Sequence, residues 1–73
     1  MYSHIKVGDL IRISYLSHKK DVLQSKLFCI VLEKDQYSHT NCTFVLLDSN
    51  GRKCWHVANA NDPYKNIYVI QQG

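Results

Sequence analysis

Cys54 and His56 are the side chains best placed to do chemistry, because they stand two residues apart in one segment. If this segment is a strand, both side chains point to the same face. With Cys42 and His39 from the preceding segment they could supply the nitrogen and sulfur ligands of a zinc site. The chain contains neither a CxxC nor an HxxxH spacing, however. We therefore expect free thiols and an unligated imidazole, with no metal.

The same pair could be interpreted as a cysteine nucleophile with a histidine base. Residues two apart on a strand have Cα atoms about 6.5–7 Å from one another, which is loose for direct proton transfer. The sequence offers no obvious carboxylate to orient the imidazole, and a chain of 73 residues leaves little room for a catalytic cavity. We expect no enzyme activity and no cofactor.

A β-hairpin from Cys42 to Val57 is the clearest structural signal in the sequence. Two apolar segments flank Asp48-Ser49-Asn50-Gly51, which predicts a type I turn with the glycine in the left-handed conformation. A three-residue loop at positions 49–51 would place Val45 opposite Trp55. The turn therefore predicts the register of the hairpin as well as its existence.

Both predicted faces of this hairpin carry large apolar side chains, whereas a sheet covered on one side only would have one polar face. One face holds Val45, Leu47, Trp55 and Val57, and the other holds Phe44, Leu46, Cys54 and His56. Either a curved barrel and its loops cover both faces, or one face meets a partner. We expect Trp55 in the core, and we take the face of Phe44, Leu46 and His56 as the candidate interface.

The remaining elements predict further short strands. Apolar and polar residues alternate over Leu10–Leu16, the segment Lys26–Lys34 contains the continuous apolar run Leu27–Leu32, and a last short strand is expected over Ile67–Ile70. A helix capped by Asp21 is the alternative for the middle run. A short 3₁₀ turn is expected near Pro63, and residues 71–73 are expected to fray.

Length and composition indicate one globular domain over residues 1–73. The net charge of +3 is mild, and the charges are scattered. The first residues lack the apolar core of a signal peptide, so a location in the cytoplasm of a host cell or in a virion is expected rather than secretion. Three cysteines, an odd number, favour reduced thiols over a disulfide framework.

Five short strands with one long first loop predict an all-β fold, a small five-stranded barrel with a short 3₁₀ turn before the last strand. The chain resembles the SH3-like barrel in Val7-Gly8-Asp9-Leu10-Ile11, in Ile30-Val31-Leu32-Glu33, in the turn at Gly51, in Trp55 and in Tyr68-Val69-Ile70. More narrowly, it is similar to small, uncharacterised SH3-like proteins of tailed bacteriophages. The resemblance implies a non-catalytic binding module, an accessory or structural protein.

Two classes of partner fit such a module. The first is another protein or a second copy of the chain, with a candidate surface of Tyr15, Tyr37, Phe44, Leu46, His56 and Tyr64. The second is nucleic acid, as in Tudor, KOW and Sm-type barrels, with candidate basic contacts at Lys19, Lys20, Arg52 and Lys53. A membrane partner is not expected, because no segment approaches the ~20 apolar residues that span a bilayer.

Overall fold

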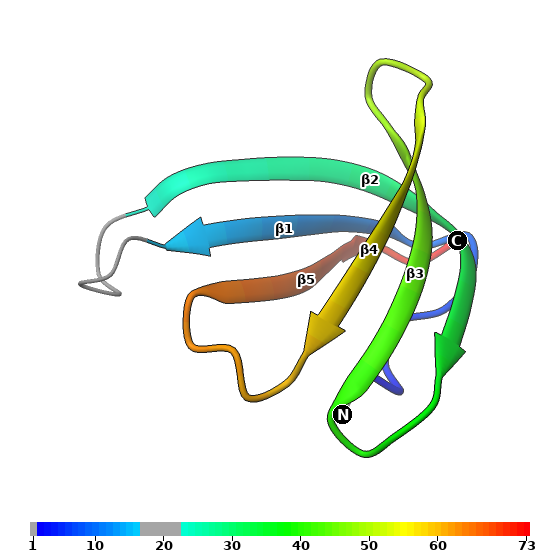
Figure 1. Cartoon of the computed structure of the whole chain (residues 1–73). Helices are drawn as coiled ribbons and strands as arrows, with labels where there is room; N and C mark the ends of the chain where they lie inside the picture. The colour runs from blue at the N-terminus through cyan, green and yellow to red at the C-terminus, as the bar shows by residue number, and fades with distance from the viewer. Residues whose placement is uncertain (1, 17–22) are drawn as a thin grey trace.

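The chain forms one antiparallel β-sheet, seen here in a computed structural model that describes residues 2–16 and 23–73, without the side chains of residues 23–26 (Figure 1). The strands are β1 (Leu10–Leu16), β2 (Leu23–Gln36), β3 (Asn41–Asp48), β4 (Lys53–Asn59) and β5 (Lys65–Gln71). They lie in the order β4-β3-β2-β1-β5. The described residues contain no helix, and none of them forms a segment of the kind that crosses a membrane as a helix.

The predicted all-β fold with five strands is confirmed, and the strand alternative for the middle run is correct. β1 has the predicted bounds, whereas β2 extends beyond the predicted segment Lys26–Lys34 at both ends. The sheet is not closed, because β4 and β5 are its two edges and do not pair with each other. The long first loop predicted over Ser17–Ser25 includes residues 17–22, which lie outside the described part of the chain.

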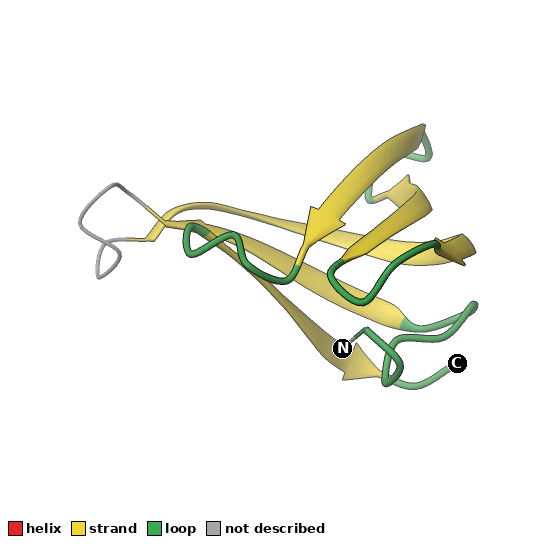
Figure 2. Cartoon of the chain, turned by 60° about the horizontal axis from the view of Figure 1, so that its bottom comes forward, coloured by secondary structure: helices red, strands yellow, loops and turns green. Residues whose placement is uncertain are grey.

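The long strand β2 divides the sheet into two layers. Its first part pairs with β1 from Leu23 to Ile30, and its second part pairs with β3 from Cys29 to Gln36. The register shifts between Val31 and Glu33, and such a bulge bends a strand. The hairpin of β3 and β4 is thereby folded across the layer of β1, β2 and β5 (Figure 2).

The core lies between these two layers. Alternation along each strand turns one set of side chains inward. Phe44 is fully buried there and meets the Tyr2 ring edge-on, with ring centroids 5.9 Å apart. The other fully or almost fully buried apolar residues of this core are Ile5, Ile11, Ile13, Cys29, Val31, Cys42, Leu46 and Ala58.

The turn between β3 and β4 has the predicted conformation. Gly51 has a φ of 79°, in the left-handed region, and its N–H donates to the carbonyl of Asp48 at 3.0 Å. The Asp48 carboxylate accepts the N–H groups of Asn50 and Arg52, each at 2.9 Å. The predicted register is confirmed, with Val45 opposite Trp55.

The connection from β4 to β5 consists of turns held by side chains. The Asn59 side chain accepts the N–H of Asn61 at 2.8 Å, and the Asp62 carboxylate accepts the N–H of Tyr64 at 2.9 Å. These are the local bonds that Asn and Asp form in turns. The 3₁₀ turn expected here is not observed among the described residues.

Asp9 joins the two ends of the described chain. Its carboxylate accepts the N–H of Lys6 at 2.9 Å and the N–H of Gly73 at 3.0 Å. Gly8, at a φ of 95°, lies against Gly73 so closely that a Cβ on Gly73 would overlap its carbonyl. Of the residues expected to fray, Gln71 belongs to β5 and Gly73 is bonded to the turn before β1.

Candidate binding surface at the free edge of β4

The predicted interface on the hairpin faces inward. Phe44 and Leu46 have no exposed surface, so neither residue can form part of a binding surface, and their assignment to one is wrong. The physical reason is the bend in β2, which folds this face of the hairpin onto β1 and β5. On β4 the face removed from water carries Cys54, His56 and Ala58, whereas the face left in water carries the charged Lys53.

The opposite face of the hairpin is the exposed one. Trp55 is 77% exposed and Val57 is 59% exposed, so the expectation that Trp55 lies in the core is also wrong. Val45 beside them is covered, whereas Leu47 is partly exposed. A tryptophan this exposed is uncommon in a monomeric domain and marks a contact site better than a scattered leucine does.

The other predicted aromatic residues do not gather into one groove. Tyr15 is half-buried on the inner face of β1 and meets the His56 ring, with centroids 6.2 Å apart. Tyr37 is exposed in the loop between β2 and β3. Tyr64 is half-buried in the connection before β5, where its carbonyl accepts the N–H of Leu16. Of these rings, Tyr15 is the one seen to contact His56 in the described part of the chain.

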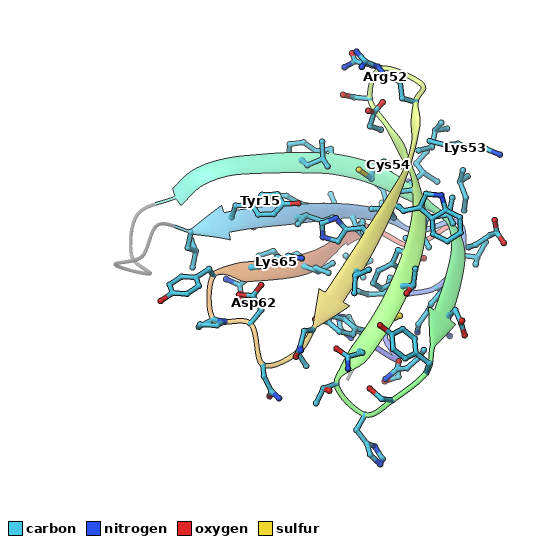
Figure 3. All side chains as sticks on the ribbon, in the orientation of Figure 1. Tyr15, Arg52, Lys53, Cys54, Asp62 and Lys65 are labelled. Atoms are coloured by element: carbon cyan, nitrogen blue, oxygen red, sulfur yellow. The ribbon has the colours of Figure 1, made fainter. Side chains whose placement is uncertain are left out.

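The described basic residues form no stripe. Arg52 lies at the tip of the hairpin and Lys53 begins β4, and both are exposed. Figure 3 shows Tyr15 and Lys65 on one side of β4 and Lys53 pointing to the other. Lys19 and Lys20 lie outside the described residues.

β4 presents unpaired backbone groups because it is an edge of the sheet. The N–H of Asp48 donates to Arg52, and the N–H of Ala60 donates to Thr40, so the even-numbered residues of β4 face β3. In an antiparallel ladder the alternate residues then point their N–H and C=O groups away. For β4 these are Lys53, Trp55 and Val57, followed by Asn59, whose carbonyl accepts the N–H of Asp62. We call these backbone groups, with the side chains of Trp55 and Val57, the β4 edge.

A gap that we call the seam separates this edge from β5. The Cα atoms of β4 and β5 stay more than 8 Å apart, whereas neighbouring strands in a sheet lie about 4.8 Å apart. Lys65 of β5 crosses the seam, and its ammonium donates to the carbonyl of Val57 at 3.0 Å. The contact between Tyr15 and His56 crosses from β1 to β4.

His56 is held neutral beside the seam. Burial, followed by the positive charge of Lys65, lowers the pKa of its imidazole. Its Nε2 atom is buried and has no hydrogen-bond partner among the described residues. The imidazole therefore acts as a packing group against Tyr15.

The three cysteines are not paired in a disulfide, and two of them are buried. Burial, together with the neighbouring Cys54, raises the pKa of the Cys29 thiol to about 11. Burial also raises the pKa of Cys42. A thiol with a raised pKa is a poor nucleophile at neutral pH. Among residues 2–16 and 23–73, no three side chains of His, Cys, Asp or Glu come together as a metal site.

A second apolar surface lies on the outer side of the other layer. Phe28 and Ile30 of β2 are each 41% exposed and line a shallow hollow with Leu10 and Leu47. This hollow lies over β1, β2 and the end of β3, which all have neighbours on both sides. It offers apolar contact but no row of free backbone groups, so the β4 edge is the more complete recognition surface.

The sequence did contain a signal for the exposed face of the hairpin. Lys53 shares a face with Trp55, while the other face of β4 has only Cys54, His56 and Ala58. A charged residue on one face marks the solvent side, because lysine is almost never fully buried without a partner. The free edge itself had no signal, since it depends on the order of the strands.

Comparisons with known proteins give no further guide to this surface. No family model, no curated protein and no solved structure matches the chain.

Proposed function

We propose that the chain is a small SH3-like, non-catalytic module that binds another protein through the β4 edge. The observation that carries the proposal is Trp55, a large apolar side chain that is 77% exposed on an edge strand. Tryptophan, with tyrosine and arginine, is enriched among the residues that contribute most of the binding energy at protein interfaces.

The other features of the site support binding rather than catalysis. His56 has a lowered pKa and no carboxylate among the described residues bonds to it, and the buried thiols have raised pKa values. A nucleic-acid surface would need cations beside exposed rings. In the described part of the chain, Lys53 is the exposed cation on the face of Trp55, the basic residues form no stripe, and Tyr15 and Tyr64 are half-buried.

A selection from a random peptide library displayed on yeast tests the proposal. Peptides enriched on the intact chain should bind it in calorimetry, and Trp55→Ala should weaken them at least tenfold, as expected for a residue at the centre of an interface. Tyr37→Ala is the matched control, because Tyr37 is also an exposed ring, 58% exposed, but lies in the loop between β2 and β3. Its peptide affinities should stay unchanged.

Two results would contradict the proposal. One is a set of enriched peptides that bind the wild-type chain and the Trp55→Ala variant equally well. The other is the absence of any enriched peptide together with salt-sensitive binding of single-stranded or duplex nucleic acid.

A further inference from the structure

We infer that the partner segment is an extended, acidic peptide that adds to β4 as an antiparallel strand and lies in the seam. This inference rests on the proposed function and specifies the partner's conformation and chemistry. An edge strand with free N–H and C=O groups is the template for such addition. The neighbouring pairs of this sheet are all antiparallel, which fits a further antiparallel strand.

β5 leaves the hydrogen-bonding side of β4 unpaired. An added strand would lie about 4.8 Å from β4. β5 stays more than 8 Å away, Cα to Cα, so it does not occupy that position. The backbone groups of Trp55 and the N–H of Val57 point into this space. The wall on the β1 side is the half-buried ring of Tyr15, which packs against the core.

Lys65 selects the chemistry of the added strand. The Lys65 ammonium donates a hydrogen bond to the carbonyl of Val57. An N–H group of an added strand would have to donate to the same carbonyl. A strand that takes this carbonyl leaves the ammonium without its acceptor, and an unsatisfied charge is costly. A carboxylate on the incoming strand would replace the carbonyl as the partner of Lys65. A strand without a carboxylate would leave the Lys65 ammonium without a charged partner.

The geometry of an antiparallel pair places this carboxylate. Two residues of the added strand would pair with Trp55 and Val57. The side chains of these two residues point to the outer face, beside Trp55 and Val57. The residue between them directs its side chain to the inner side, from which Lys65 reaches across. The preferred segment therefore has two apolar residues separated by one aspartate or glutamate.

The same features disfavour a second copy of the chain as the occupant. Each copy carries a net charge of +3, with Arg52 and Lys53 at one end of β4 and Lys65 at the other. Pairing two β4 strands would bring these cations together and supply no carboxylate for the displaced ammonium. Lysine at a sheet edge is a known obstacle to pairing between copies.

The test uses a capped seven-residue fluorescent probe with valines at alternate positions and one glutamate between two of them. Two derivatives carry a single N-methyl group, one on the valine that would bond to Trp55 and one on the glutamate. Fluorescence anisotropy should show binding of the parent probe to the intact chain. Methylation of the valine should weaken it about tenfold, because a backbone bond is lost, and methylation of the glutamate should not.

The role of Lys65 is tested with a glutamine probe and a Lys65→Met variant. The wild-type chain should prefer the glutamate probe about three- to fivefold, the range of a partly exposed ion pair. Lys65→Met should lose this preference, and the matched variant Lys6→Met, which removes one exposed charge elsewhere, should keep it. The comparison of the two methylated probes uses the wild-type chain alone, so it still tests strand addition if the Lys65→Met variant does not fold.

Three outcomes would overturn the inference. Equal affinities of the two methylated probes would exclude strand addition, and a glutamate preference that survives in Lys65→Met would exclude the proposed partner of Lys65. The free chain could also form a dimer at micromolar concentration. If the Trp55→Ala variant is then monomeric, a second copy of the chain occupies the β4 edge. If library peptides bind through Trp55 but these probes fail, the proposed function stands and strand addition is overturned.

Discussion

At the scale of single residues, the structure separates side chains that resemble one another in the sequence. Phe44 and Trp55 are both large rings on neighbouring strands, yet Phe44 is fully buried and Trp55 is 77% exposed. Cys54 and His56 suggested chemistry by their spacing. The structure gives them packing roles, because His56 meets Tyr15 and Cys54 packs against the core.

His56 should make stability depend on pH near neutrality. The pKa of His56 in the folded chain is below the ordinary value of 6.5. Above pH 6.5 the imidazole is therefore mostly neutral in both the folded and the unfolded chain, and His56 does not make stability depend on pH there. As pH falls from there through the lowered pKa, the unfolded chain binds a proton that the folded chain does not, and stability is lost. Urea unfolding at pH 7.5 and 5.5 should show this loss, and His56→Phe should reduce it.

His39→Gln is the control for this measurement, because His39 is exposed in the loop between β2 and β3. That variant should keep the wild-type loss of stability between the two pH values. An equal loss in wild-type chain and His56→Phe would show that His56 is not the group responsible.

We expect that Gly51 is required because of its left-handed backbone conformation, and not because a side chain at this position would clash with neighbouring atoms. Its φ of 79° lies where side chains with a Cβ are strained, although a Cβ there would meet no atom within 4 Å. Gly51→Ala should lower the free energy of unfolding by about 1 kcal/mol, and Gly51→Asn by less, since Asn tolerates this region better. Chemical denaturation measures both. Equal effects of the two substitutions would contradict a purely conformational cause.

At the scale of elements, the sequence predicted the hairpin well and its surroundings less well. The turn residues determine register locally, so the pairing of Val45 with Trp55 followed from positions 48–51 alone. The choice of the buried face did not, because it depends on the bulge between Val31 and Glu33 and on the strands that the hairpin then meets. Local pattern carries no information about that bend.

Substitution at the two rings of the hairpin should show which face is the core. Phe44→Ala removes a fully buried ring and should lower the free energy of unfolding by about 3–5 kcal/mol, which is most of the stability of a small domain. Trp55→Ala should change it by about 0.5 kcal/mol or less. Thermal and urea unfolding measure both. A larger effect at Trp55 than at Phe44 would reverse the assignment of the faces.

At the scale of the whole molecule, the open seam and the joined ends are the features that the sequence could not supply. Each depends on contacts between residues far apart in the chain, such as Asp9 with Gly73 and Lys34 with Tyr2 and Ile5. The free edge of β4 is likewise a property of the sheet, since it follows from the separation of β4 and β5.

Asp9 should stabilise the joined ends through its charge. Its pKa lies below the ordinary value of 3.8, chiefly because the N–H of Gly73 and then the N–H of Lys6 donate to the carboxylate. The stabilisation is present above pH 3.8 and is lost as pH falls through the lowered pKa. Asp9→Asn should therefore be less stable than the wild-type chain at pH 7, and the difference should narrow below pH 3.8. The exposed Asp35→Asn should show no such pattern.

Amide hydrogen exchange along β4 in the free chain tests the central claim, that β4 is a free edge available to a partner, most directly. The N–H groups of Trp55 and Val57 should exchange fast, while those of Cys54, His56 and Ala58, which face β3, should be protected, and the alternation should not change with protein concentration. Slow exchange at Trp55 and Val57 as well would contradict it, because another strand or another copy of the chain would then already cover the edge.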